Sequence, residues 1–138
     1  MWGRRKSNER GAAIIEFALV LPILVVLVFG IIQFGLYFNR AQAFNAAARE
    51  GARIGAIPTT SQSDIQTSVL SALGAVKVDD LESAPAVAVT PDTDFPCRDR
   101  EGESIVVEVT SSQAIEIPVW PSNGTSVGLT GRGEFRCE

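Results

Sequence analysis

The residue that most needs a chemical explanation is Glu16. It interrupts the otherwise apolar stretch GAAIIEFALVLPILVVLVFGIIQFGLYF, which runs from Gly11 to Phe38. A carboxylate on a lipid-facing helix costs free energy that an apolar residue would avoid. Glu16 is therefore a candidate functional residue, unless its side chain simply snorkels to the cytoplasmic headgroups.

The two cysteines, Cys97 and Cys137, can either form a disulfide or remain as independent reduced thiols. Both follow the apolar stretch, and in an oxidising compartment they would pair, which is the outcome we expect. The bond would close a loop of about 40 residues and contribute about 4 kcal/mol by a chain-entropy estimate. The chain has no histidine and no third cysteine, which argues against a zinc site.

No set of residues forms a recognisable catalytic site. Without histidine, a serine or cysteine nucleophile would need a lysine or carboxylate base, and Lys77 is not part of any motif. Acidic residues between positions 92 and 101 could offer oxygen ligands to calcium, but they lack the EF-hand spacing and are better explained as a solvated surface. We therefore expect no enzymatic activity, no cofactor and no metal. The net charge of −4 also argues against nucleic acid as a partner.

The apolar stretch that carries Glu16 is long enough to cross a membrane. At about 1.5 Å per helical residue it would reach about 40 Å, against a hydrocarbon core of roughly 30 Å. Residues 1–11 are basic, and most of the acidic residues follow the stretch. By the positive-inside tendency, the N-terminus stays in the cytoplasm and the C-terminal part lies outside. Residues 1–11 show no apolar periodicity, so we expect them to be unstructured until something binds them.

The helical pattern continues beyond the apolar stretch. Good helix formers run without a break as far as Pro58, which predicts one long helix from about Ala12 to Ile54. Its second half carries two rows of small residues at four-residue spacing, which would let another backbone come close. These are Ala47, Gly51 and Gly55 in one row and Ala48, Ala52 and Ala56 in the next. The alternative is that alanine is a good helix former and the glycines mark the helix end.

The rest of the chain predicts a short helix followed by a small antiparallel sheet, so the fold class is α+β. The helix is expected from about Ser63 to Leu73, with an apolar stripe along one side. Strands are expected at about residues 84–89, 104–110, 114–119 and 126–137. Glycines at positions 128, 131 and 133 indicate a bulge or a twisted region in the last strand. The sequence PSNGTS is typical of a hairpin turn through Asn123 and Gly124, which explains the Asn-Gly-Thr triplet without a sugar.

The opening of the chain resembles the processing region of type IV pilins and pseudopilins. A short basic leader, Gly11, and AAIIE at the start of a long apolar helix carry this resemblance. It implies that a prepilin peptidase cuts between Gly11 and Ala12, leaving Glu16 as the fifth residue of the mature chain. Glu16 of one subunit could then neutralise the freed amine of Ala12 on a neighbour. In a low dielectric, such a pair offsets much of the cost of burying either charge.

More narrowly, the first 56 residues or so are similar to TadE-like proteins, the minor pilins or pseudopilins of tight-adherence (Tad, Flp-type) pili. The ending LTGRGEFRCE also looks like the close of that family. The resemblance implies roles in assembly for Glu16, Phe17 and Pro22. Pro22 is either an ordinary kink of a membrane helix or a point of local melting during assembly. The segments that carry the resemblance are Arg10-Gly11, Glu16-Phe17-Ala18, Pro22, Gln33-Phe34-Gly35 and, above all, Ala48-Arg49-Glu50-Gly51-Ala52-Arg53.

This resemblance divides the chain into a basic prepilin leader (1–11), a hydrophobic helix that is membrane span and assembly core (12–56) and a small extracytoplasmic α+β domain (57–138). The chain would span the bacterial inner membrane once, with its N-terminus inside. A prepilin peptidase, an inner-membrane assembly platform and an assembly ATPase would then bring it, with other pilin subunits, into an adhesive surface pilus. The size of the outer domain favours a minor or tip subunit.

Two rival functions remain at this point. One is a single-pass, membrane-anchored extracytoplasmic binding protein that is never assembled into a filament. The other is a secreted protein whose apolar stretch is a signal peptide, cut at the A-x-A-like site from Ala46 to Ala48.

Overall fold

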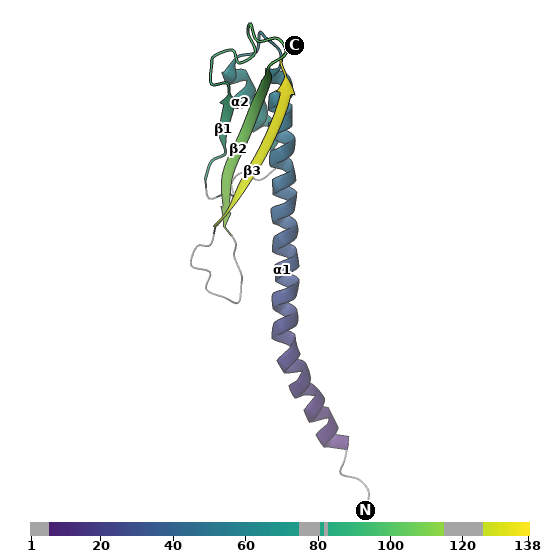
Figure 1. Ribbon diagram of the computed structural model, residues 1–138. Coiled ribbons are helices and arrows are strands. Elements are labelled where there is room, and N and C mark those ends of the chain that lie inside the picture. Colours follow the sequence, from purple (N-terminus) through teal and green to yellow (C-terminus); the bar gives the residue numbers. More distant parts are fainter. Residues whose placement is uncertain (1–5, 75–80, 82, 115–125) are drawn as a thin grey trace, which may run out of the picture.

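The computed structural model describes residues 6–74, 81, 83–114 and 126–138. It consists of one long helix with a compact unit at its C-terminal end (Figure 1). The elements in chain order are helix α1 (Lys6–Gly55), helix α2 (Gln62–Leu73) and strands β1 (Ala86–Thr90), β2 (Ser104–Ala114) and β3 (Ser126–Arg136). The predicted α+β class, with a long helix, a short helix and a small antiparallel sheet, is confirmed.

Helix α1 begins earlier than the sequence predicted. It starts at Lys6, so the expectation that residues 1–11 are unstructured is wrong for positions 6 to 11. The physical reason is cooperativity: once a helix exists, each added residue gains a hydrogen bond at little further cost, and KSNER contains no proline or glycine to stop it. At the other end α1 stops at Gly55, close to the predicted end and ahead of Pro58.

Helix α2 is fixed at its start by a capping box. The Ser61 hydroxyl accepts a hydrogen bond from the Asp64 backbone N–H (3.2 Å), and the Asp64 carboxylate accepts one from the Ser61 backbone N–H (3.4 Å). These bonds satisfy N–H groups that a helix N-terminus leaves without partners. The apolar stripe of Ile65, Val69 and Leu73 is buried, as the helical periodicity predicted.

The three strands form an antiparallel sheet in the order β1-β2-β3. β2 pairs with β3 residue for residue from Ser104↔Arg136 to Ala114↔Ser126. The prediction of a break after Thr110 is therefore wrong. In the polar sequence TSSQ, Thr110 is exposed and the side chains of Ser111 and Ser112 hydrogen-bond with Ser83, so these residues can continue the strand at little cost. Gln113 is the exception, because its side chain is buried. Beyond Ala114, the strand predicted at 114–119 and the turn at Asn123 and Gly124 lie outside the described residues.

The glycines of β3 do not form a bulge, since the register with β2 is continuous. Instead, two of them let α1 lie directly on the strand. A Cβ added to Gly131 would collide with the backbone carbonyl of Phe44, and one added to Gly133 with that of Ala48. Only a residue without a side chain fits at this distance, which explains why glycine is needed at both positions.

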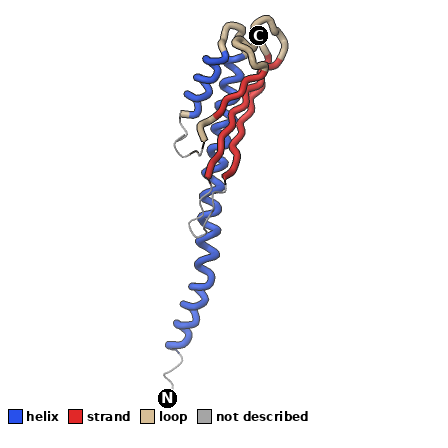
Figure 2. Tube along the Cα trace, turned by 90° about the vertical axis from the view of Figure 1, so that its left-hand side faces the viewer, coloured by secondary structure: helices blue, strands red, loops and turns tan. Residues whose placement is uncertain are grey.

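The core lies between the sheet and the two helices. Along β2, buried Ile105, Val107 and Val109 alternate with more exposed side chains, so only one face of the sheet is covered. Figure 2 shows the strands running beside the C-terminal part of α1. The remaining core side chains come from the two helices, from β1 and β3 and from the segments that flank them: Phe44, Ala47, Ala48, Ala52, Ala56, Ile65, Val69, Leu73, Val89, Cys97, Leu129 and Cys137. We call this packed unit, with α1 from Tyr37 onward, the head.

Candidate functional site

Between Gly11 and Leu36, helix α1 is almost entirely exposed, and we call this segment the stalk. Within it only Val25 and Gln33 are half-buried, whereas large side chains such as Ile14 and Phe34 are each 69% exposed. By length and composition this helix could cross a membrane. A continuous apolar surface of this size is far beyond what soluble monomers leave open, so it must be covered by lipid or by other helices.

The predicted processing and assembly residues lie at the N-terminal end of the stalk. Gly11, Ala12, Glu16 and Phe17 are all exposed on α1. Within the described part of the chain, Glu16 has no hydrogen-bond or ion-pair partner. Nothing in that part of the chain therefore compensates its charge. In an apolar environment, the compensation must come from another molecule or from the water and headgroups at a membrane surface.

Pro22 lies inside α1 without interrupting it. Because proline has no backbone N–H, the carbonyl of Ala18 lacks its usual helical partner. In a membrane or a helix bundle that carbonyl needs another donor. The helix remains continuous through Pro22, and a role of this residue in local melting during assembly stays a prediction.

The two rows of small residues on α1 are covered by the chain's own head. Ala47, Ala48 and Ala52 are at most 1% exposed. A Cβ on Gly51 would collide with the side chain of Val69, and one on Gly55 with that of Ile105. The close approach that the sequence pattern anticipated is therefore made by the chain itself, and these rows are not available to a neighbouring subunit.

Two polar residues of α1 that the sequence reasoning did not single out fix the helix to the edge of the sheet. The Tyr37 hydroxyl donates to the Gly128 carbonyl (3.4 Å), and the Asn45 side-chain oxygen accepts from the Arg132 backbone N–H (3.3 Å). Both satisfy backbone groups of the edge strand β3, which would otherwise be open to pairing with another chain. A signal for these contacts was present in the sequence, because helical spacing places Tyr37, Ala41, Asn45 and Ala48 along one side of α1.

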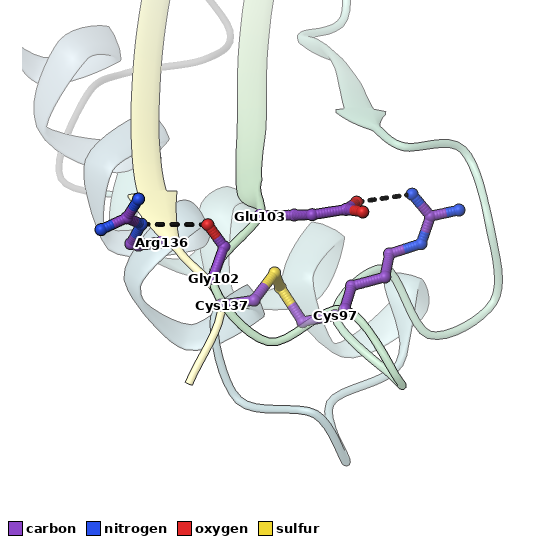
Figure 3. The surroundings of a disulfide bond; sticks show 6 residues. Cys97, Gly102, Glu103, Arg136 and Cys137 are labelled. Atoms are coloured by element: carbon purple, nitrogen blue, oxygen red, sulfur yellow. Dashed lines mark hydrogen bonds and ion pairs between the residues drawn. A yellow bond between two sulfur atoms is a disulfide. The ribbon is translucent and has the colours of Figure 1, made fainter.

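A disulfide joins Cys97 and Cys137 at the far end of the head (Figure 3). Their Cα atoms are 5.4 Å apart, and both side chains are buried. Backbone hydrogen bonds hold the same corner, from Gly102 N–H to Cys137 C=O (3.1 Å) and from Cys137 N–H to Glu103 C=O (2.7 Å). The C-terminus is thus fixed both to the loop after β1 and, through Glu138 N–H and Ala56 C=O (3.1 Å), to the end of α1.

The outward side of α1 within the head carries charge. Arg53 donates two hydrogen bonds to Glu50, at 2.9 and 2.6 Å. These bonds, and the positive charge of Arg53, hold the pKa of the Glu50 carboxyl below its usual value. Arg49, one position earlier in the same turn, is exposed. The pair is solvated and screened, so it marks an accessible surface more than a source of stability.

The acidic loop after β1 does not assemble a metal site. Among residues 83–114, and in the rest of the described chain, no three potential ligands come together. The Asp92 carboxylate accepts a hydrogen bond from Gln62 (3.0 Å), and the Arg98 guanidinium lies 3.7 Å from the centroid of the Phe95 ring. These contacts order the loop and offer no acid–base pair or nucleophile, so the stalk is the feature of this molecule that calls for a functional explanation.

Comparison with known proteins finds a family similarity in the part of α1 that contains the stalk. The family model described as TadE-like protein matches residues 11–53, which include Glu16, Phe17, Pro22 and the whole stalk. No curated protein and no solved structure matches the chain. The predicted resemblance is confirmed over those residues, and the head beyond α1 lies outside the match.

Proposed function

Since residues 11–53 are TadE-like, we propose that this chain is a pilin or minor pseudopilin of a Tad (Flp-type) pilus system. It would be cleaved after Gly11 and assembled through its N-terminal helix into an adhesive surface pilus. The observation that carries the proposal is the bare stalk, an apolar helix with an uncompensated carboxylate near its start and a folded head at its other end. Such a helix needs lipid around it at one stage and other helices at the next.

We expect Glu16 to act in assembly because its own charge has no partner among the described residues. Cleavage between Gly11 and Ala12 creates a cationic amine one helical turn from Glu16. Within one subunit that amine and the carboxylate could meet, but between staggered subunits the same pair would also fix how far one helix slides along another. Phe17 (65% exposed) and the other apolar side chains would supply the packing around the pair.

The partners expected on this proposal are other pilin subunits, a prepilin peptidase and an inner-membrane assembly platform. Before assembly the chain would sit in the bacterial inner membrane with its N-terminus in the cytoplasm and its head outside. The disulfide between Cys97 and Cys137 suits an oxidising compartment.

The first test is the N-terminus of the mature protein. A pilin should begin at Ala12, and a plain membrane anchor at or near Met1. A secreted protein cut at the A-x-A-like site would begin near Arg49, which would remove Phe44 and the buried Ala47 and Ala48 from the core. Loss of that packing argues against the secreted alternative.

The second test separates a pilin from a permanently anchored binding protein. Glu16→Gln should lower recovery in sheared surface fibres while membrane insertion stays intact, because loss of a pairing energy of about 1.4 kcal/mol lowers an equilibrium about tenfold. Glu50→Gln is the matched control, since Glu50 is also on α1 but lies outside the stalk and pairs within its own chain. Equal recovery of the two variants would contradict the assembly role of Glu16.

A further inference from the structure

We propose that, before assembly, the base of the head rests directly on the phospholipid headgroups of the extracytoplasmic leaflet, with no helical spacer between membrane and head. The base consists of the strand ends at Ser112–Ala114 and Ser126–Gly128 together with Tyr37 of α1. This inference takes the membrane-inserted state of the proposed function as its starting point and adds the depth of insertion and a lipid-facing surface on the head.

The first observation is that the head begins where the apolar stretch ends. The Tyr37 hydroxyl bonds to the Gly128 carbonyl, and its ring packs against the core. One residue later the apolar stretch ends at Phe38, and Asn39 follows. A tyrosine with an apolar ring and a hydroxyl at its tip is the side chain that membrane–water boundaries favour. The last two residues of the apolar stretch, Tyr37 and Phe38, therefore already lie in the first turn of α1 within the head.

The second observation is the distance along the stalk. From Glu16 to Leu36 the helix advances about 30 Å, at 1.5 Å per residue, which is one hydrocarbon thickness. The depth that places Tyr37 among the outer headgroups therefore places Glu16 at the inner boundary. Both polar groups reach water or headgroups only at this depth, whereas a shift of two turns in either direction would bury one of them in hydrocarbon.

The third observation is the level at which exposed aromatic rings gather. Phe34 is 69% exposed and Phe38 is 54% exposed, and their rings stack with centroids 6.5 Å apart and an interplanar angle of 12°. This pair lies within one turn of Tyr37, at the same level of α1. Lipid is the occupant that covers such rings on a helix where no other described part of the chain covers them.

The charges of the head agree with this orientation. The described residues of the base are uncharged: Ser112, Gln113, Ala114, Ser126, Val127 and Gly128. The acidic side chains Asp92, Asp94, Asp99 and Glu101 lie in the loop after β1, which ends near the disulfide at the opposite end of the head (Figure 1). An anionic leaflet would repel that loop, and no described residue of the base carries a negative charge that would add to the repulsion.

Cysteine accessibility tests the depth. The native cysteines are joined to each other, so an introduced cysteine is the one reactive thiol. Full-length Leu36→Cys and Gln42→Cys variants, both at exposed positions of α1, would be treated in spheroplasts with a membrane-impermeant maleimide. We expect Gln42→Cys to react and Leu36→Cys to react only after detergent is added. Reaction of Leu36→Cys in intact membranes would show a helical spacer and overturn the proposal, as would protection of Gln42→Cys.

Fluorescence quenching tests the lipid contact of the head itself. A fluorophore on Ser126→Cys, at the base, should be quenched by lipids that carry a nitroxide on the headgroup. The matched control is Ser63→Cys, an exposed position on α2, which should not be quenched. Equal quenching at both sites would overturn the proposal. Cleavage after Gly11 and recovery in fibres are measured separately. The proposed lipid contact can therefore be refuted while the pilin assignment stands, and the pilin assignment can be refuted while the lipid contact stands.

Discussion

Two alanine substitutions on the same strand should change stability in opposite directions. At Gly131 an added Cβ would collide with the backbone carbonyl of Phe44, and neither α1 nor β3 can rotate that group away. Overpacking of this kind costs about 1–3 kcal/mol. At Gly128 the same methyl group would meet nothing within 4 Å. There the substitution restricts the unfolded chain and should stabilise by about 0.4–1 kcal/mol.

The expected difference between Gly131→Ala and Gly128→Ala is therefore about 1.5–4 kcal/mol in the free energy of unfolding of the head. We expect the stalk to stay helical in detergent when the head unfolds, so the measurement needs a local probe. Hydrogen exchange of the β2 amides in the full-length, detergent-solubilised protein reports opening of the sheet alone. If the β2 amides are protected from exchange equally in both variants, Gly131 is not needed for the close packing of α1 on β3.

Three further results are expected. Replacement of Cys97 and Cys137 by serine should lower the free energy of unfolding by about 4 kcal/mol, and the intact exported protein should shift on a gel when reduced; free thiols in that form would contradict the disulfide. Gln113→Met should stabilise the head by about 1 kcal/mol in the same exchange assay, because the buried Oε1 has no hydrogen-bond partner in the described structure. The hydrogen bonds from Arg53 lower the folded-state pKa of Glu50 below the usual value of 4.5. Their pair therefore stabilises the head above that value, and this contribution to stability is lost as the pH falls through the lowered pKa. Glu50→Gln should remove this small pH dependence of the head's stability.

The features that could be predicted from sequence are those set by neighbouring residues. The stripe of Ile65, Val69 and Leu73 is a local periodicity, and it indicated α2 and its buried side correctly. Glu16 was equally easy to single out, because one acidic residue in a long apolar stretch is unusual without any knowledge of tertiary contacts.

The features that could not be predicted depend on contacts between distant segments. Gly131 and Gly133 were interpreted as a bulge or a twisted region, because a sequence does not reveal that α1, far earlier in the chain, lies on that strand. For the same reason, Gly51 and Gly55 indicated that another segment would pack closely on α1, but not whether that segment belongs to the same chain or to a neighbouring subunit. The sequence TSSQ looked like the end of a strand, and only its pairing with β3 shows that it extends β2.

The coverage of α1 restricts how copies of this chain can meet. From Tyr37 to Ala56 one side of the helix is occupied by the chain's own head, and the disulfide and the Glu138–Ala56 bond close the end of that contact. A neighbour can therefore approach the head along α1 only on the opposite side of the helix, where Gln42, Ala46 and Arg49 are exposed. Among the described residues, nothing restricts the stalk in this way. Assembly contacts should for this reason be dense and apolar along the stalk, and fewer and more polar beside the head.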